Sequence, residues 1–155
     1  MGAFIKISVN PRDMQKVKNT GKRINKGTLL GVKKGMKLFR TEARKFSGSN
    51  QLKIKSGALR DSIDYTVKES GGQIIGTLGS DKIYASIHEY GGTITARRAK
   101  FLIFKTKDGW RRVESVNIPP RPFLRPAIEN NRDEVAKIIN REVLKSFSSS
   151  RIFRR

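Results

Sequence analysis

The chain has 155 residues, a mass of 17.5 kDa and no cysteine, which excludes disulfides, thiolate metal sites and cysteine nucleophiles. The single histidine excludes metal sites built from several imidazoles. The length predicts one domain, residues 1–147, with a short basic Ser/Arg tail at 148–155 that we expect to be mobile. The absence of a long apolar run or a secretory signal predicts a soluble protein made in a reducing cytoplasm.

The chain is strongly basic, and the excess is concentrated before residue 49. In total, 34 Lys and Arg residues against 13 Asp and Glu residues give a formal net charge of +21. Residues 11–48 carry 12 basic and 2 acidic residues, a net charge of +10. A solvated helix face explains any single lysine there. Because self-repulsion costs stability, however, the excess predicts a polyanion or an acidic protein close by.

The first elements predicted are a strand and a long helix. In Ala3–Val9, aliphatic side chains occupy every second position, and this period of two is typical of a strand. Asn10, Pro11 and Asp13 suit a helix start. A helix from about 11 to 47 is predicted, because apolar residues recur at helical spacing: Val17, Ile24, Val32, Phe39, Ala43 and Phe46.

Three glycines lie on one face of this helix. Gly27, Gly31 and Gly35 recur every four residues, and each costs about 1 kcal/mol relative to Ala in a helix interior. The neighbouring lysines exclude a pair of membrane helices. The glycine face therefore predicts close packing against another backbone, and the alternative is a break near Gly27 or Gly31 that gives two shorter helices.

The middle of the chain predicts short elements. Ser56–Ile63 resembles one capped turn of helix, and a hairpin of Asp64–Glu69 and Gln73–Gly79 is predicted around Ser70–Gly72. Ile83–Tyr90 is predicted as another short helix with Ile83 and Ile87 on one face. The following segments give the end of that helix, a strand and a second hairpin: Gly91-Gly92, Thr93–Ala96, and Phe101–Phe104 with Trp110–Val113 around Asp108-Gly109.

The C-terminal part predicts an extended proline segment and then a long helix. The prolines of 119–126 fix an extended approach and a helix start. An amphipathic helix is predicted from Ala127 to about Phe147. The fold class that follows is α+β, in which a small, mostly antiparallel sheet is packed by a long N-terminal helix and a long C-terminal helix.

No catalytic signature is found. His88-Glu89 begins a helical zinc-protease motif, but the second histidine would fall at Gly92. Four acids could in principle hold Mg²⁺ in a nuclease, although solubilising charge explains them better: Asp61, Asp64, Glu69 and Asp81. We therefore expect no enzyme, no metal and no cofactor. The charge suits contact with a phosphate backbone but not reading of its sequence.

Three stretches together resemble a known family. They are Ser56–Ile63 (SGALRDSI), Tyr84–Gly92 (YASIHEYGG) and Pro119–Ile128 (PPRPFLRPAI). Their order and spacing are similar to those of the neck or tail-completion proteins of long-tailed bacteriophages, the head–tail joining family, and of the related virion-morphogenesis proteins of contractile-tailed phages. The resemblance covers roughly residues 55 to 145, and the long basic helix before them also fits.

The resemblance implies a structural virion protein without catalysis. Such proteins form homo-oligomeric rings, commonly hexameric, in the neck or tail, where they join head to tail around double-stranded DNA. The expected partners are further copies of the chain, the neighbouring head-closure, tail-terminator or tail-tube proteins, and DNA contacted without sequence preference. No membrane partner is expected. The alternatives are a free nonspecific double-stranded DNA-binding protein and a small metal-dependent nuclease.

Two sets of residues are candidates for these contacts. Aromatic and arginine side chains suit interfaces, and prolines pre-order the segment that carries them. The alternative for Phe123 and Leu124 is that they fill the core of the chain itself. The predicted interface residues are Tyr84, Glu89, Tyr90, Arg121, Phe123 and Arg125. The predicted DNA-proximal residues are Lys33, Lys34, Lys37, Arg97, Arg98 and Lys100.

Overall fold

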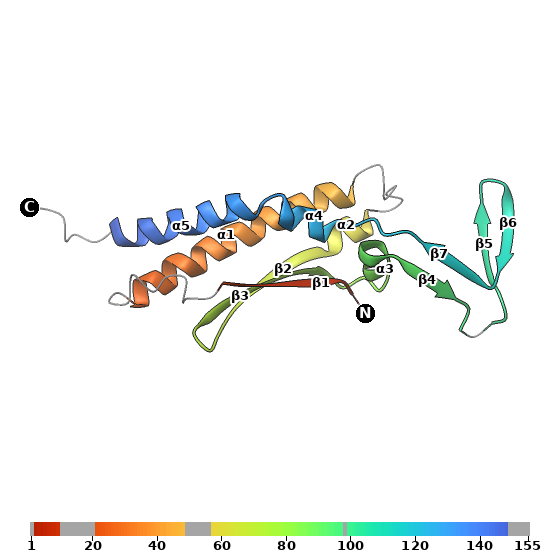
Figure 1. The fold of residues 1–155 in the computed structure, drawn as a ribbon, viewed down its shortest axis with the longest axis horizontal. Coiled ribbons are helices and arrows are strands. Elements are labelled where there is room, and N and C mark those ends of the chain that lie inside the picture. Colours follow the sequence, from red (N-terminus) through yellow and green to blue (C-terminus); the bar gives the residue numbers. More distant parts are fainter. Residues whose placement is uncertain (1, 10–20, 49–56, 98, 149–155) are drawn as a thin grey trace, which may run out of the picture.

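The chain divides into a helix-and-sheet body and a β arm that extends from it (Figure 1). The structure is a computed structural model that describes residues 2–9, 21–48, 57–97 and 99–148. The body holds the two long helices, a three-stranded sheet and three short helices. The arm consists of the four strands between Gly92 and Ile118. The predicted α+β class is confirmed, with both long helices present.

Helix α1, Gly21–Ser47, runs along the whole body without a break. Val32, Met36, Phe39 and Ala43 are all buried, because their spacing places them on one stripe that faces the sheet and the rest of the core. The predicted helix is thus confirmed over these residues, and the alternative of a break at the glycines is wrong. The predicted helix start and Val17 lie outside the described residues.

The glycine face of α1 packs against helix α5, Arg132–Ser148. A Cβ atom on Gly31 would meet the Cα of Ile139 at 2.7 Å, and one on Gly27 would meet the carbonyl oxygen of Glu142 at 3.0 Å. A Cβ on Gly35 would meet a side chain, that of Val135, at 2.5 Å. The predicted close approach of another backbone is therefore confirmed, and the partner is a helix of the same chain.

Substitution of Gly31 tests this packing. A larger side chain must push α5 away from α1, and overpacking of this kind costs about 1–3 kcal/mol. We expect Gly31→Leu to lower the free energy of unfolding by that amount and Gly31→Ala to lower it by less. Thermal melts decide the point, because Ala in an open helix would instead stabilise by up to about 1 kcal/mol. A stabilised Ala variant together with a harmless Leu variant would contradict the packing.

The three-stranded sheet lies beneath α1 with strand order β1-β3-β2, all antiparallel (Figure 1). Its strands are β1, Phe4–Val9, β2, Ile63–Ser70, and β3, Gln73–Ser80. Gly71 and Gly72 form the turn between β2 and β3 with φ of 58° and 75°, a conformation that favours glycine. The first predicted strand and the first predicted hairpin are both confirmed.

Two short helices flank the β2–β3 hairpin in the chain, and the second of them leads into the arm. Helix α2, Ala58–Ser62, begins after Gly57, which has φ of 70° and makes no side-chain cap. Helix α3, Ala85–Tyr90, ends at Gly91 with φ of 72°, as predicted. Its predicted start was two residues too early, because Ile83 lies before the helix and is 80% exposed.

The arm contains two separate two-stranded sheets rather than part of one sheet. Strand β4, Gly92–Thr95, pairs with β7, Ser115–Ile118, and strand β5, Leu102–Thr106, pairs with β6, Gly109–Val113. The predicted strand and hairpin are confirmed, although the turn residues are Lys107 and Asp108 because Thr106 pairs with Gly109. Strand β7 was not predicted. The single small sheet of the prediction is therefore wrong: the described strands form three sheets.

The predicted C-terminal helix is two helices. Helix α4, Leu124–Glu129, and helix α5 are separated at Asn130 and Asn131. The Asn131 side chain donates to the carbonyl oxygen of Ala127 at 2.9 Å, and its own carbonyl accepts from the Val135 amide at 3.0 Å. Asparagine competes with helical hydrogen bonds in this way, and the one continuous helix expected here is corrected accordingly.

Candidate interaction surfaces

The carboxylate of Glu89 joins two of the three sequence stretches singled out above. Its Oε2 accepts hydrogen bonds from the amides of Phe123 and Leu124 at 2.8 and 2.9 Å, and its Oε1 accepts from the amide of Arg125 at 2.9 Å. Glu89 is 1% exposed. The first amides of a helix lack partners within the helix, and a carboxylate is a favourable acceptor for them. Glu89 therefore caps α4 and fixes the proline segment against α3.

Phe123 and Leu124 lie wholly inside the chain. Both are 0% exposed and belong to the core cluster that also contains Phe39 and Leu78. The alternative that these two residues fill the core of the chain itself is the one found. Burial likewise removes Glu89 from the surface, so its position and that of Phe123 do not support a direct contact of either side chain with a neighbour.

The other predicted interface residues surround this joint at the surface. Tyr84 and Tyr90 are 43% and 54% exposed. The Arg125 guanidinium lies 5.8 Å from the centre of the Tyr90 ring, and the Tyr84 ring meets His88 edge-on at 6.1 Å. The Arg121 amide donates to the His88 carbonyl at 2.7 Å, which leaves the half-buried Arg121 side chain at the edge of the joint. Their role in a subunit contact stays a prediction.

His88 and two carboxylates have shifted pKa values. Burial lowers the pKa of His88 below its ordinary value of 6.5, and the nearby Arg121 charge lowers it further. The Tyr65 amide and then the Arg40 guanidinium hold the pKa of Asp64 below its usual range. Hydrogen bonding from Lys34 does the same for Glu142. His88 is thus neutral and the two carboxylates are ionised in the folded protein at pH 7.

These shifts predict how the free energy of unfolding depends on pH. The unfolded chain binds a proton at His88 more readily than the folded chain, so stability falls as the pH drops below 6.5. It levels off once folded His88 is protonated, and it falls again in acid as Asp64 and Glu142 are protonated. Denaturant titrations of the wild type and His88→Gln measure this. We expect the variant to lose only the first decline, and an unchanged first decline would contradict the assignment to His88.

The predicted basic residues do not form one cluster. Lys33, Lys34 and Lys37 lie exposed along α1 in the body, whereas Arg97 and Lys100 lie in the arm between β4 and β5 (Figure 1). The Lys34 ammonium is 2.9 Å from a Glu142 oxygen on α5, so it also links the two long helices. Arg98 lies outside the described residues. The described members of the set therefore lie on two separate surfaces, and their proximity to DNA stays a prediction.

The arm is a surface that the sequence patterns did not reveal. None of its described residues is buried, and Trp110 and Ile103 are 73% and 66% exposed. The Arg112 guanidinium lies 3.7 Å from the centre of the Phe101 ring, which is a favourable cation–π contact. Polar and apolar residues do not alternate in Leu102–Phe104, and this was a signal that the hairpin has no buried face. Exposed apolar side chains on such an extension are typical of a binding surface.

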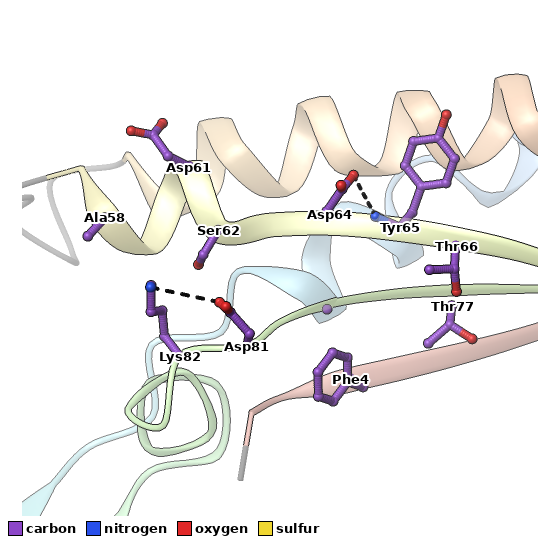
Figure 2. Close-up of a pocket in the computed structure, with 11 residues that line it drawn as sticks. Phe4, Ala58, Asp61, Ser62, Asp64, Tyr65, Thr66, Thr77, Asp81 and Lys82 are labelled. Atoms are coloured by element: carbon purple, nitrogen blue, oxygen red, sulfur yellow. Dashed lines mark hydrogen bonds and ion pairs between the residues drawn. The ribbon is translucent and has the colours of Figure 1, made fainter.

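A hollow of about 650 Å³ lies where α2 meets the three-stranded sheet (Figure 2). Three aspartates from different elements line it: Asp61 of α2, Asp64 of β2 and Asp81 after β3. Lys82 and the exposed residue Phe4 are among the other residues that line it. These aspartates do not assemble a metal site, because within the described ranges no three His, Cys, Asp or Glu residues lie close enough to hold an ion.

These features define a small, basic α+β protein whose distinctive surfaces are a β arm and an aspartate-lined hollow, which suits assembly with other chains. The sequence profile of the phage virion morphogenesis family matches residues 32–144, and the chain belongs to that family. The match spans most of α1, the Glu89 joint, the arm and most of α5. No match was found among curated proteins or among solved structures. Of the helices described, none is long and apolar enough to cross a membrane.

The chain is therefore a structural protein of phage virion morphogenesis. This agrees with the class of protein implied by the sequence resemblance, and it indicates that the protein is located in the virion.

Proposed function

We propose that the protein is a ring subunit of the neck or tail of a tailed phage, where copies of it join the head to the tail around the DNA path. The observation that carries this proposal is the arm, which has no described buried residue and exposes Trp110 and Ile103. A chain of this size gains nothing from such an extension alone, because exposed apolar area is unfavourable until a partner covers it. The family membership supports that partner being a virion component.

The surface residues of the Glu89 joint are proposed as a second part of the contact. Tyr84, Tyr90 and Arg125 remain exposed around a rigid centre, and amphipathic aromatic side chains with arginine are favoured at interfaces. Arg121 at the edge of the joint suits a carboxylate or a carbonyl oxygen of a neighbouring subunit. We expect a hexameric ring, in contact with the adjoining head-closure, tail-terminator or tail-tube proteins.

Particles made without the protein test its place in assembly. If it joins head to tail, a host infected with phage that lacks the functional gene should accumulate filled heads and free tails as separate particles. Addition of the purified protein to an extract of both should restore joined particles. Electron microscopy counts them. Normal joining in the absence of the protein, or loss of tails altogether, would contradict a joining role.

The basic face of α1 is proposed to lie near DNA. A chain with net charge +21 that contacts phosphates should bind duplex DNA without sequence preference, and each contact removed should lower the slope of log K against log salt by about one. We expect this lowered slope for the double variant with Lys33→Gln and Lys37→Gln, which leaves the Lys34–Glu142 pair intact. Lys68→Gln with Lys137→Gln is the control matched in charge. Equal slopes for both pairs would show that the face is only solvated.

A further inference from the structure

We propose that the β arm of one subunit docks into the aspartate-lined hollow of the next copy of this chain, and that this head-to-tail contact closes the ring. The inference rests on the proposed ring and goes beyond it, because it assigns the two surfaces that meet. It is drawn from the charge and apolar area of the arm and of the hollow, which match each other.

One face of the β5–β6 hairpin combines cations with large apolar groups. Cross-strand partners share a face of a hairpin, and Ile103 pairs with Arg112 while Lys105 pairs with Trp110. The two apolar members of this face are 66% and 73% exposed. Residues 92–118 carry 7 basic and 2 acidic residues, a net charge of +5. The face therefore fits an acidic partner that also offers an apolar contact.

The hollow offers both. The side chains of Asp61, Asp64 and Asp81 are 64%, 69% and 76% exposed, and among the residues lining the hollow only Lys82 is basic. Phe4, whose ring lies against Gly79, is 58% exposed at the same place. In a chain with net charge +21, a lining with three acidic residues and one basic residue is unusual, although each aspartate has a cation of the same chain beside it. An aromatic and an aliphatic side chain of the arm can cover Phe4 while a cation of the arm meets Asp81. Figure 2 shows the carboxylates of Asp61 and Asp64 directed away from Phe4, where they can meet further cations at the rim of the hollow.

Two of the three aspartates, Asp61 and Asp81, are available to a partner. Asp61 pairs with its neighbour Arg60 at 3.0 Å, and Asp81 is 4.0 Å from its neighbour Lys82. Ion pairs this exposed contribute little to stability, so exchange for a cation of another subunit costs little. Asp64 differs, because it accepts hydrogen bonds from both Arg40 and the Tyr65 amide within the chain.

A second copy is the occupant that the geometry favours. All residues that line the hollow belong to the body, and the arm of the same chain extends away from the body (Figure 1). Two different surfaces that meet between identical chains make a heterologous contact, which generates a closed ring when the rotation fits. DNA is disfavoured as the occupant of the hollow, since aspartates repel phosphates. Trp110 on the arm could stack on unpaired bases but has no comparable role on a duplex.

Two variants and their mixture test the contact. The arm variant carries Lys105→Ala and Trp110→Ala, and the hollow variant carries Asp61→Lys and Asp81→Lys, all at exposed positions. We expect each variant alone to melt like the wild type but to lose the ring, as measured by native mass. Their mixture should give a one-to-one dimer, because the intact arm of one variant enters the intact hollow of the other and no second arm-to-hollow contact can form.

Cysteine cross-linking gives an independent result, because the chain contains no cysteine of its own. A chain with both Lys105→Cys and Asp81→Cys should form a ladder of disulfide-linked oligomers on mild oxidation, whereas neither single cysteine should. Asp133→Cys with Lys105→Cys is the control, with a cysteine on α5 in place of the one in the hollow. A ladder from that control equal to the ladder from the pair would overturn the assignment.

The outcomes separate this inference from the proposed function. If either variant alone still forms wild-type rings, the ring stands but the arm does not enter the hollow. If the wild type stays monomeric at every concentration, both the ring and this contact are wrong. If the arm variant keeps the ring and loses only duplex DNA binding, the arm is a DNA surface and the inference is overturned.

Discussion

Replacement of Phe123 by Ala should lower the free energy of unfolding by about 3–5 kcal/mol. Phe123 is 0% exposed and heads the fully buried side chains by volume, so its loss removes apolar contacts and leaves a cavity that the surrounding helices and sheet can close only in part. Denaturant titration measures the change. The hypothesis from the sequence, that Phe123 anchors a neighbouring subunit, predicts a different result, namely a folded variant that fails to assemble.

Truncation of an exposed aromatic residue is the matched control. Tyr90, close to the same joint, is 54% exposed, and we expect Tyr90→Ala to change the free energy of unfolding by less than about 1 kcal/mol. A Phe123→Ala variant as stable as Tyr90→Ala would contradict the burial found here and would restore Phe123 as a candidate for the subunit contact.

Replacement of Glu89 by Ala should lower the free energy of unfolding by about 2–4 kcal/mol. The change leaves three amides, those of Phe123, Leu124 and Arg125, without their acceptor, and the first two are buried. Hydrogen bonds to a charged acceptor are worth more than neutral ones, although removal of a buried charge offsets part of the loss. Thermal and denaturant melts measure the net effect.

Glu89→Gln separates the hydrogen bonds from the packing. The amide keeps the shape and one acceptor oxygen of the side chain but loses the charge and the second acceptor, so we expect a cost between those of the wild type and Glu89→Ala. Equal costs for Gln and Ala would mean that the charge matters and the shape does not. No cost for either would show that α4 does not depend on this cap.

The parts of the fold that the sequence predicts well are those set by local rules. The stripe of Val32, Phe39 and Ala43 fixes the face of α1, and the glycine repeat on the adjoining face correctly predicts close helix packing. The Gly71-Gly72 pair defines its turn, because positive φ at both positions favours glycine. Each of these signals lies within one element or between neighbouring ones.

The parts that it misses depend on contacts between distant segments. Strand β7 is only Ser115–Ile118, and it exists because it pairs with β4 across the whole length of the β5–β6 hairpin. The break at Asn130-Asn131 depends on how one side chain competes with the helix. The division into three sheets follows from which strands meet, and no local pattern encodes that choice.

The candidate site shows the same division. The stretches around Tyr90 and Arg125 were found from sequence, and they do lie together. The reason they lie together is Glu89, whose hydrogen bonds cross more than thirty positions of sequence. Sequence composition places an aromatic or an acidic residue in a motif but does not say whether its side chain faces the interior, as Phe123 and Glu89 do, or a neighbour.

Native mass measurement of the purified protein at modest salt tests the central claim most directly. A structural ring subunit should appear as one closed oligomer, which we expect to be a hexamer, in equilibrium with little monomer and without bound nucleic acid. A stable monomer at all concentrations, which binds duplex DNA on its own, would contradict the account and favour a nonspecific DNA-binding protein.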